Sequence, residues 1–165
     1  MTRLLILTVM ALGLAASHGA IYTFNLSLDG LQEVGPNASP GTGTGTALFD
    51  DSTTSISLSL TFSGLTSSAT ASHIHLGAPG VNGGVIVSFV PYTPAATSGT
   101  ITGGPLPFPS ANVAALMAGN TYFNIHTANY PGGEIRGQLV LVPEPSAMSL
   151  AALGGLALIA SRRRR

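Results

Sequence analysis

The sequence predicts an all-β fold, a Greek-key-type β-sandwich or barrel with one short helix. Three observations lead to this prediction. The 165 residues include 21 glycines and 11 prolines, which are residues that end strands and form turns. Hydrophobic residues make up 45% of the chain and charged residues only 7%. Between the turns, apolar residues alternate with serine and threonine, which is typical of strands with one buried face.

The alternation locates the individual strands. The expected strands cover residues 22–29, 41–49, 56–62, 85–89 and 99–103. In the second of these, glycine alternates with threonine, and either Leu48 or Phe49 is expected to reach the core. The helix is expected after these strands, with Ser110 as its N-cap, residues 113–118 as its body and Gly119 as its stop.

The N-terminal residues 1–20 have the composition of a secretory signal peptide. A short basic region contains Arg3, an apolar run covers residues 4–16, and small residues follow. This order of regions is typical of a segment that directs export and is then removed. We therefore expect the folded domain to cover residues 21–141.

The C-terminal residues 142–165 have the composition of a membrane anchor. Pro143, Glu144 and Pro145 end the domain, because proline continues neither a strand nor a helix. Residues 146–160 are mostly apolar and would form a helix about 22 Å long, against a bilayer core of about 30 Å. Four arginines follow this apolar helix, and they are expected to stay in the cytoplasm.

The central domain is nearly free of cations. Between residues 21 and 143 the single base is Arg136, against five carboxylates. A domain with one cation does not neutralise a run of phosphates, so no nucleic-acid partner is expected. Arg136 is expected to form a structural ion pair with Glu134 or Glu33. The chain has no cysteine, which excludes disulfides and thiolate ligands.

His73 and His75 form a His-x-His pair at the end of a predicted strand. Residues two apart in a strand share one face, so both imidazoles point the same way, about 6.6 Å apart along the strand. Ile74 and Leu76 then point to the opposite face, toward the core.

A second segment resembles this one. Each has an isoleucine-histidine pair, a loop with Pro-Gly, and a glycine that leads into another strand. In the second segment Phe123 and Ile125 are the apolar partners, which places Tyr122, Asn124 and His126 on the polar side.

His73, His75 and His126 are therefore candidate metal ligands. Three imidazoles bind one ion and leave a fourth position open, an arrangement suited to copper or zinc. The other interpretation is that the imidazoles bond to loop carbonyls and pack the ends of the hairpins. The His-x-His strand also resembles the copper-binding strand of copper–zinc superoxide dismutase, but the further ligands and the disulfide of that enzyme have no counterpart.

Residues 22–141 resemble the CHRD (chordin) domain. The resemblance rests on three motifs in order, Leu-Asp-Gly-Leu-Gln-Glu-Val at 28–34, His-Ile-His-Leu-Gly at 73–77, and Tyr-Phe-Asn-Ile-His-Thr at 122–127 leading to Pro-Gly-Gly-Glu-Ile-Arg-Gly at 131–137. At Gly35-Pro36 the sequence departs from the two prolines that the family often has. The resemblance implies an extracellular all-β module.

Residues 142–165 resemble the PEP-CTERM sorting signal of bacterial exported proteins. The resemblance rests on the Pro-Glu-Pro motif, the short apolar helix and the basic end. It implies transient anchoring in the inner membrane and cleavage by an exosortase-type enzyme near Pro143, Glu144 and Pro145. It also implies delivery to the cell surface or the extracellular polysaccharide matrix.

Two functions are expected from these observations. The first is that of an exported, non-enzymatic surface or matrix protein, whose domain binds extracellular polysaccharide or another surface protein. The alternative is a histidine-based copper- or zinc-binding module with a site like that of superoxide dismutase. The sequence shows no complete set of catalytic residues, so an enzyme is not expected.

Overall fold

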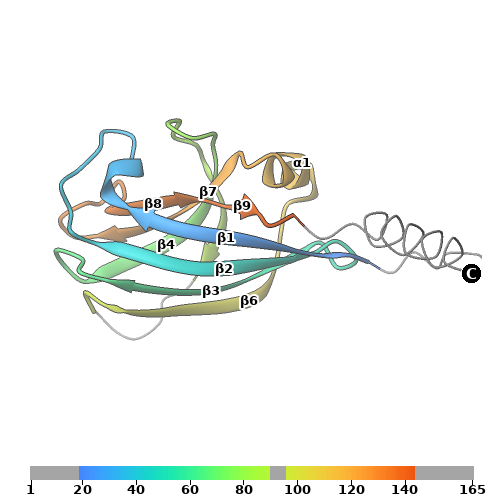
Figure 1. Ribbon diagram of the computed structural model, residues 1–165, viewed down its shortest axis with the longest axis horizontal. Helices are drawn as coiled ribbons and strands as arrows, with labels where there is room; N and C mark the ends of the chain where they lie inside the picture. Colours follow the sequence, from blue (N-terminus) through green and yellow to red (C-terminus); the bar gives the residue numbers. More distant parts are fainter. Residues whose placement is uncertain (1–18, 90–95, 144–165) are drawn as a thin grey trace, which may run out of the picture.

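The computed structural model describes residues 19–89 and 96–143, which form nine β-strands in one antiparallel sheet (Figure 1). The strands are β1 (Ile21–Asp29), β2 (Thr42–Asp50), β3 (Ser55–Ser63), β4 (Ala69–Leu76), β5 (Val85–Phe89), β6 (Gly99–Pro107), β7 (Thr121–Thr127), β8 (Ile135–Gln138) and β9 (Val140–Leu141). The predicted apolar segments at the two ends of the chain lie outside the described residues.

The sheet curls into a nearly closed barrel. Its strand order is β5-β4-β7-β8-β1-β2-β3-β6, and β9 also pairs with β1. The edge strands β5 and β6 approach each other, since a Cβ added to Gly103 would lie 3.0 Å from the Phe89 ring. The connections from β3 to β4 and from β6 to β7 join strands that are not neighbours in the sheet, as in Greek-key folds. The predicted all-β class is confirmed.

The alternation of the sequence produces the core. In β1 and β3 every second side chain points into the barrel, and the serines and threonines between them face outward. In β2 it is Phe49 that is buried, whereas Leu48 is 45% exposed. The largest buried apolar side chains are those of Phe24, Leu28, Phe49, Ile56, Leu60, Ile74, Ile101, Leu116, Phe123, Ile125 and Ile135.

Leu76 does not reach the core, contrary to the expectation from the alternation. The pairing of β4 with β5 shifts between Ile74 and His75, because β5 carries an extra residue, Ile86, at that point. The extra residue belongs to β5, and the pairing of β4 with β7 continues without a shift through Leu76. Leu76 is 38% exposed because it is the last residue of β4 and lies beyond the final residue pair with β5, where Val85 is 50% exposed.

The expected helix is present but shorter than predicted. It is α1 (Val113–Met117), and a 3₁₀ turn over Ser110–Asn112 precedes it. Ser110 is not the N-cap of this helix, because Asn112 is the residue that directly precedes it. Gly119 follows the helix with a φ of 72°, the left-handed conformation in which glycine ends helices. No helix in the described ranges is both long enough and apolar enough to span a membrane.

Gly45 allows β2 and β3 to lie close together. A Cβ at this position would lie 2.6 Å from the Leu60 Cα and would also collide with the backbone of Ser59. Backbone atoms of a central strand cannot shift without moving the neighbouring strands that are hydrogen-bonded to it. We therefore expect Gly45→Ala to lower the free energy of unfolding by about 2–3 kcal/mol.

Denaturant titration followed by circular dichroism measures this loss. Thr44→Ala is the matched control, because Thr44 is the adjacent residue and is exposed. The control is expected to cost less than about 1 kcal/mol. Equal stability of the two variants would contradict the close approach of the strands.

Candidate metal centre

The three histidines described in the structure lie together on the outer face of β4 and β7. These strands are neighbours and antiparallel, with His73 opposite Asn124 and Ala71 opposite His126. One ring nitrogen from each of His73, His75 and His126 lies within 4.8 Å of the others. The fold therefore brings together the three residues that the sequence identified as candidate ligands.

Two of the imidazoles are held by backbone carbonyls. The Nδ1 of His75 lies 2.9 Å from the Gly83 carbonyl oxygen, and the Nδ1 of His126 lies 2.9 Å from that of Pro131. Each carbonyl belongs to the loop that follows the histidine's own strand. The two similar hairpins therefore have the same hydrogen bond between imidazole and loop. Because a carbonyl only accepts, each Nδ1 donates its proton and each Nε2 of the neutral ring carries a lone pair. The lone pair of the His126 Nε2 accepts a hydrogen bond from the Nδ1 of His73, whereas the Nε2 of His75 has no partner.

The spacing of the nitrogens is close to that of ligands on one ion. The Nδ1 of His73 lies 3.1 Å from the Nε2 of His126. Two nitrogens bound tetrahedrally to zinc at about 2.0–2.1 Å lie about 3.3 Å apart. Ring rotations that close the widest pair by at most about 1.5 Å would complete the set. The tethering of a ligand's second nitrogen to a carbonyl is also typical of metal-bound histidine.

Burial favours the neutral form of two of the imidazoles, those of His73 and His126. It lowers the pKa of His73, and the neighbouring imidazoles of His126 and His75 lower it further. Burial also lowers the pKa of His126, which outweighs the opposite effect of its bond to the Pro131 carbonyl. Imidazoles with a lowered pKa are unprotonated at neutral pH, the form that binds metals.

A stack of side chains supports His75. Its ring lies parallel to the ring of Tyr122, with centroids 4.8 Å apart and an interplanar angle of 5°. The Arg136 guanidinium carbon lies 3.4 Å from the centroid of the same tyrosine ring. Since β4 and β8 flank β7 on opposite sides, Tyr122 is held between the imidazole and the cation.

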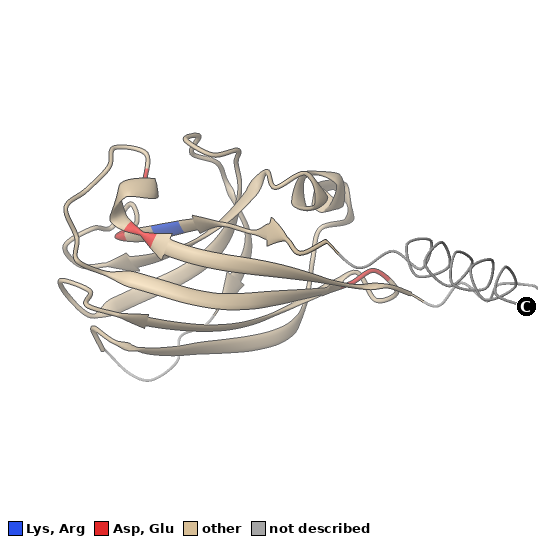
Figure 2. Ribbon diagram, in the orientation of Figure 1, with Lys and Arg blue, Asp and Glu red and all other residues tan. Residues whose placement is uncertain are grey.

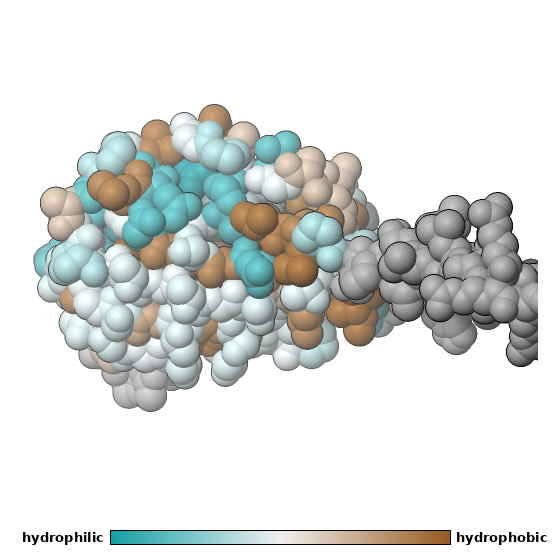
Figure 3. Space-filling model, viewed as in Figure 1, coloured by the Kyte–Doolittle hydropathy of each residue, from teal (hydrophilic) through white to brown (hydrophobic). Residues whose placement is uncertain are grey.

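Arg136 also fixes the loop that holds His75. Its Nη2 donates to the carbonyls of Ala78 (3.0 Å) and Val81 (2.9 Å). The same loop provides the Gly83 carbonyl that accepts the bond from His75. Arg136 is therefore a positioning residue for the centre. Figure 2 shows this cation on β8 close to acidic residues, and Figure 3 shows hydrophilic residues gathered over the same end.

The ion pair predicted for Arg136 is not formed as a direct contact within residues 19–89 and 96–143. Glu134 instead accepts bonds of 2.6 Å from Ser39, Thr66 and Thr127, which it links at the end of the barrel. Glu33 feels the guanidinium only as a charge at longer range. The physical reason is that Arg136 turns its donors to loop carbonyls and its face to Tyr122.

Glu33 is the second carboxylate buried near the centre. It is 8% exposed, and its Oε1 has no hydrogen-bond partner. Burial raises the pKa of Glu33 to about 7, although the charge of Arg136 opposes the shift. Glu33 lines two grooves of about 340 and 310 Å³ on either side of the 33–35 loop.

The sequence placed Tyr122 and Asn124 on the polar face but gave neither a role. Both are almost fully buried, at 3% and 2% exposed, because loops cover that face. The signal that could have identified them is their alternation with His126 along one strand. A side chain two residues away from a candidate ligand points to the same face of the strand.

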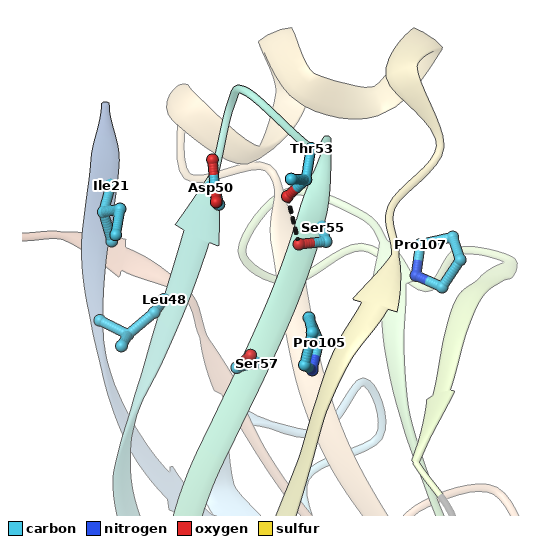
Figure 4. A pocket seen from close by; sticks show the side chains of 8 residues that line it. All are labelled: Ile21, Leu48, Asp50, Thr53, Ser55, Ser57, Pro105 and Pro107. Atoms are coloured by element: carbon cyan, nitrogen blue, oxygen red, sulfur yellow. Dashed lines mark hydrogen bonds between the residues drawn. The ribbon is translucent and has the colours of Figure 1, made fainter. Parts of the chain in front are cut away.

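A separate cavity of about 470 Å³ lies on the outer surface of β1, β2, β3 and β6 (Figure 4). Its apolar lining includes Ile21, Leu48 and two prolines. Its carboxylate, Asp50, accepts hydrogen bonds from Ser52. The strands that form this cavity carry none of the three histidines, so it is not part of the candidate centre.

The structure is an all-β domain with three histidines on two neighbouring strands. Residues 24–139 match the CHRD domain, and the chain therefore belongs to the CHRD domain family. Residues 141–165 match the PEP-CTERM protein-sorting motif. The protein is thus a bacterial protein sorted by an exosortase for export to the cell surface. The chain matches no curated protein and no solved structure.

The raised pKa of Glu33 predicts a pH-dependent cost to stability. In the unfolded chain this carboxyl ionises near its ordinary value of 4.5, but in the folded domain it ionises only at about 7. Full stability is therefore present below the lower value and is lost as the pH rises through the higher one. We expect Glu33→Gln to gain about 1–2 kcal/mol at about pH 8 and almost nothing at about pH 4.5, the gain being limited by partial hydration.

Thermal or denaturant unfolding of both proteins across this pH range measures the effect. The difference between variant and parent cancels the titration of the histidines, which both proteins share. A variant that is less stable than the parent at the higher pH would show that the ionised carboxylate is stabilising, contrary to this prediction.

Proposed function

We propose that the CHRD domain of this surface protein is a non-enzymatic metal-binding module that takes copper or zinc with His73, His75 and His126. One observation carries the proposal. Three imidazole nitrogens lie within 4.8 Å of one another, while two of the rings are tethered through their opposite nitrogens.

The ligand chemistry supports these two metals. Imidazole is a borderline donor that suits zinc and copper, and three of them with no thiolate form a neutral ligand set. If the rings served only to pack the hairpin ends, the buried nitrogens would be expected to have partners. The Nε2 of His75 is buried and has none.

The final location proposed is the cell envelope or the extracellular matrix. In this proposal the C-terminal segment anchors the precursor transiently in the inner membrane until an exosortase-type enzyme cleaves near Pro143, Glu144 and Pro145. The released domain then remains with extracellular polysaccharide or another surface protein. The match of residues 141–165 to the sorting motif supports the first steps.

Metal analysis of the purified mature domain tests the metal site. We expect about one equivalent of copper or zinc after loading and dialysis, and less than about a tenth of an equivalent in the triple variant His73→Ala, His75→Ala, His126→Ala. Metal at 100 times its dissociation constant should stabilise the fold by about 2.7 kcal/mol. The loaded domain should not accelerate superoxide dismutation.

Asn25→Ala is the matched control for this experiment. Asn25 is an exposed residue of β1, on a strand that carries no histidine, and the variant should load like the parent. Equal loading of parent and triple variant would refute the site. Turnover by the loaded parent that the triple variant loses would refute the non-enzymatic role.

Cell fractionation with mass determination tests the location. The mature form is expected in the envelope or matrix fraction, without residues 1–20 and without the tail that follows the Pro143-Glu144-Pro145 motif. Replacement of these three motif residues by alanine should leave the uncleaved precursor in the inner membrane. Recovery of the intact precursor in the cytosol would contradict the proposed route.

A further inference from the structure

Two buried acceptors face the histidine-bearing side of the sheet without partners. Among the described residues, four buried side-chain atoms make no hydrogen bond, and two of them are the Nε2 of His75 and the Oδ1 of Asn124. Both residues belong to the outer face, on the adjacent strands β4 and β7. A buried acceptor without a partner has lost its hydration without gaining a protein hydrogen bond. A cation between them would satisfy both, because an ion accepts lone pairs from nitrogen and oxygen alike.

The strand register places Asn124 beside the other two histidines. It lies directly opposite His73 across the ladder and two residues before His126 on its own strand. Opposite residues in an antiparallel pair have Cβ atoms about 4.5–5.5 Å apart. The Nε2 of His126 reaches within 3.1 Å of the Nδ1 of His73, so its ring leans along β7 toward the row that holds Asn124.

The amide nitrogen of Asn124 lies close to Gly133 and Glu33. A Cβ added to Gly133 would lie 2.8 Å from the Asn124 Nδ2 and would also meet Oε1 of Glu33. Gly133 has a φ of 135°, a conformation that favours glycine. The space above Gly133 is therefore shared by the amide nitrogen and the Glu33 carboxyl. The carbonyl oxygen is the other branch of the same amide.

We propose that the Oδ1 of Asn124 is the fourth ligand of the metal centre, an inference that rests on the proposed metal-binding function. The chain then fills the position that three histidines alone leave open. Four protein ligands are typical of structural zinc sites, whereas catalytic sites keep a position for water or substrate. Asn124 thus makes the centre closed.

A closed set of three imidazoles and one amide oxygen also favours one oxidation state of a bound copper ion. Amide oxygen is a hard donor that contributes to divalent ions, whereas Cu(I) prefers soft thiolate and thioether ligands. The centre therefore discriminates for Zn(II) and Cu(II) against Cu(I). This preference separates the inference from metal binding by the histidines alone.

The experiment compares Asn124→Leu and Asn124→Asp with the parent mature domain. Leucine keeps the size but removes the oxygen, and should weaken Zn(II) and Cu(II) binding by about 10-fold or more while leaving Cu(I) binding within about 3-fold. Aspartate replaces a neutral oxygen by a charged one, and should retain or strengthen divalent binding. Chelator competition measures the affinities, and electron paramagnetic resonance of the Cu(II) form reports the change of ligand.

Asn25→Leu is the matched control, since it makes the same substitution at an exposed strand position away from the cluster. If the parent binds no metal, the proposed function fails. If the parent binds metal and Asn124→Leu binds it equally well, only the fourth ligand is overturned. If Asn124→Leu does not fold, the Asn124→Asp variant tests the inference instead. A Cu(II) spectrum of this variant that is identical to that of the parent overturns the inference.

Discussion

The antiparallel register of β4 and β7 is the constraint on which the candidate centre depends. This register sets His73 opposite Asn124 and places His126 at the diagonal position, where its ring reaches His73. A slip by one residue would turn every side chain of a strand to the other face. The register is fixed from the inside, because Ile74, Phe123 and Ile125 on the same two strands are each completely buried in the barrel. Apolar packing on one face thus determines the polar geometry on the other.

The outer face of these strands is covered by loops, which is unusual for the polar side of an antiparallel sheet. Arg136 makes this arrangement stable without a partner carboxylate in direct contact. It is 1% exposed, and its charge is met by carbonyl dipoles and by the face of Tyr122. The same bonds hold the loop whose carbonyl orients His75. The one cation of the domain sequence therefore connects the fold to the candidate ligands.

Much of this organisation could be predicted from local pattern. The alternation in residues 22–29 and 56–62 identified the core faces of two strands, and the spacing of His73 and His75 placed both rings on one side. The fate of Leu76 could not be predicted in this way. It depends on where the pairing with β5 ends, which is a property of the two strands together rather than of either strand. The hydrogen-bond partners of Arg136 could not be predicted either, because opposite charge in the sequence does not show which carbonyls the loops present.

The sequence by itself determined the class of fold, the C-terminal sorting motif and the three histidines on one face, because alternation, composition and spacing are local properties of the chain. Only the tertiary structure decided that residues more than 50 positions apart meet, as His73 and His126 do. It also decided that Asn124 and Glu33 are buried, because the loops that cover them come from distant parts of the chain. Which buried groups lack a partner depends on three-dimensional packing, and this is the observation from which Asn124 is proposed as the fourth ligand.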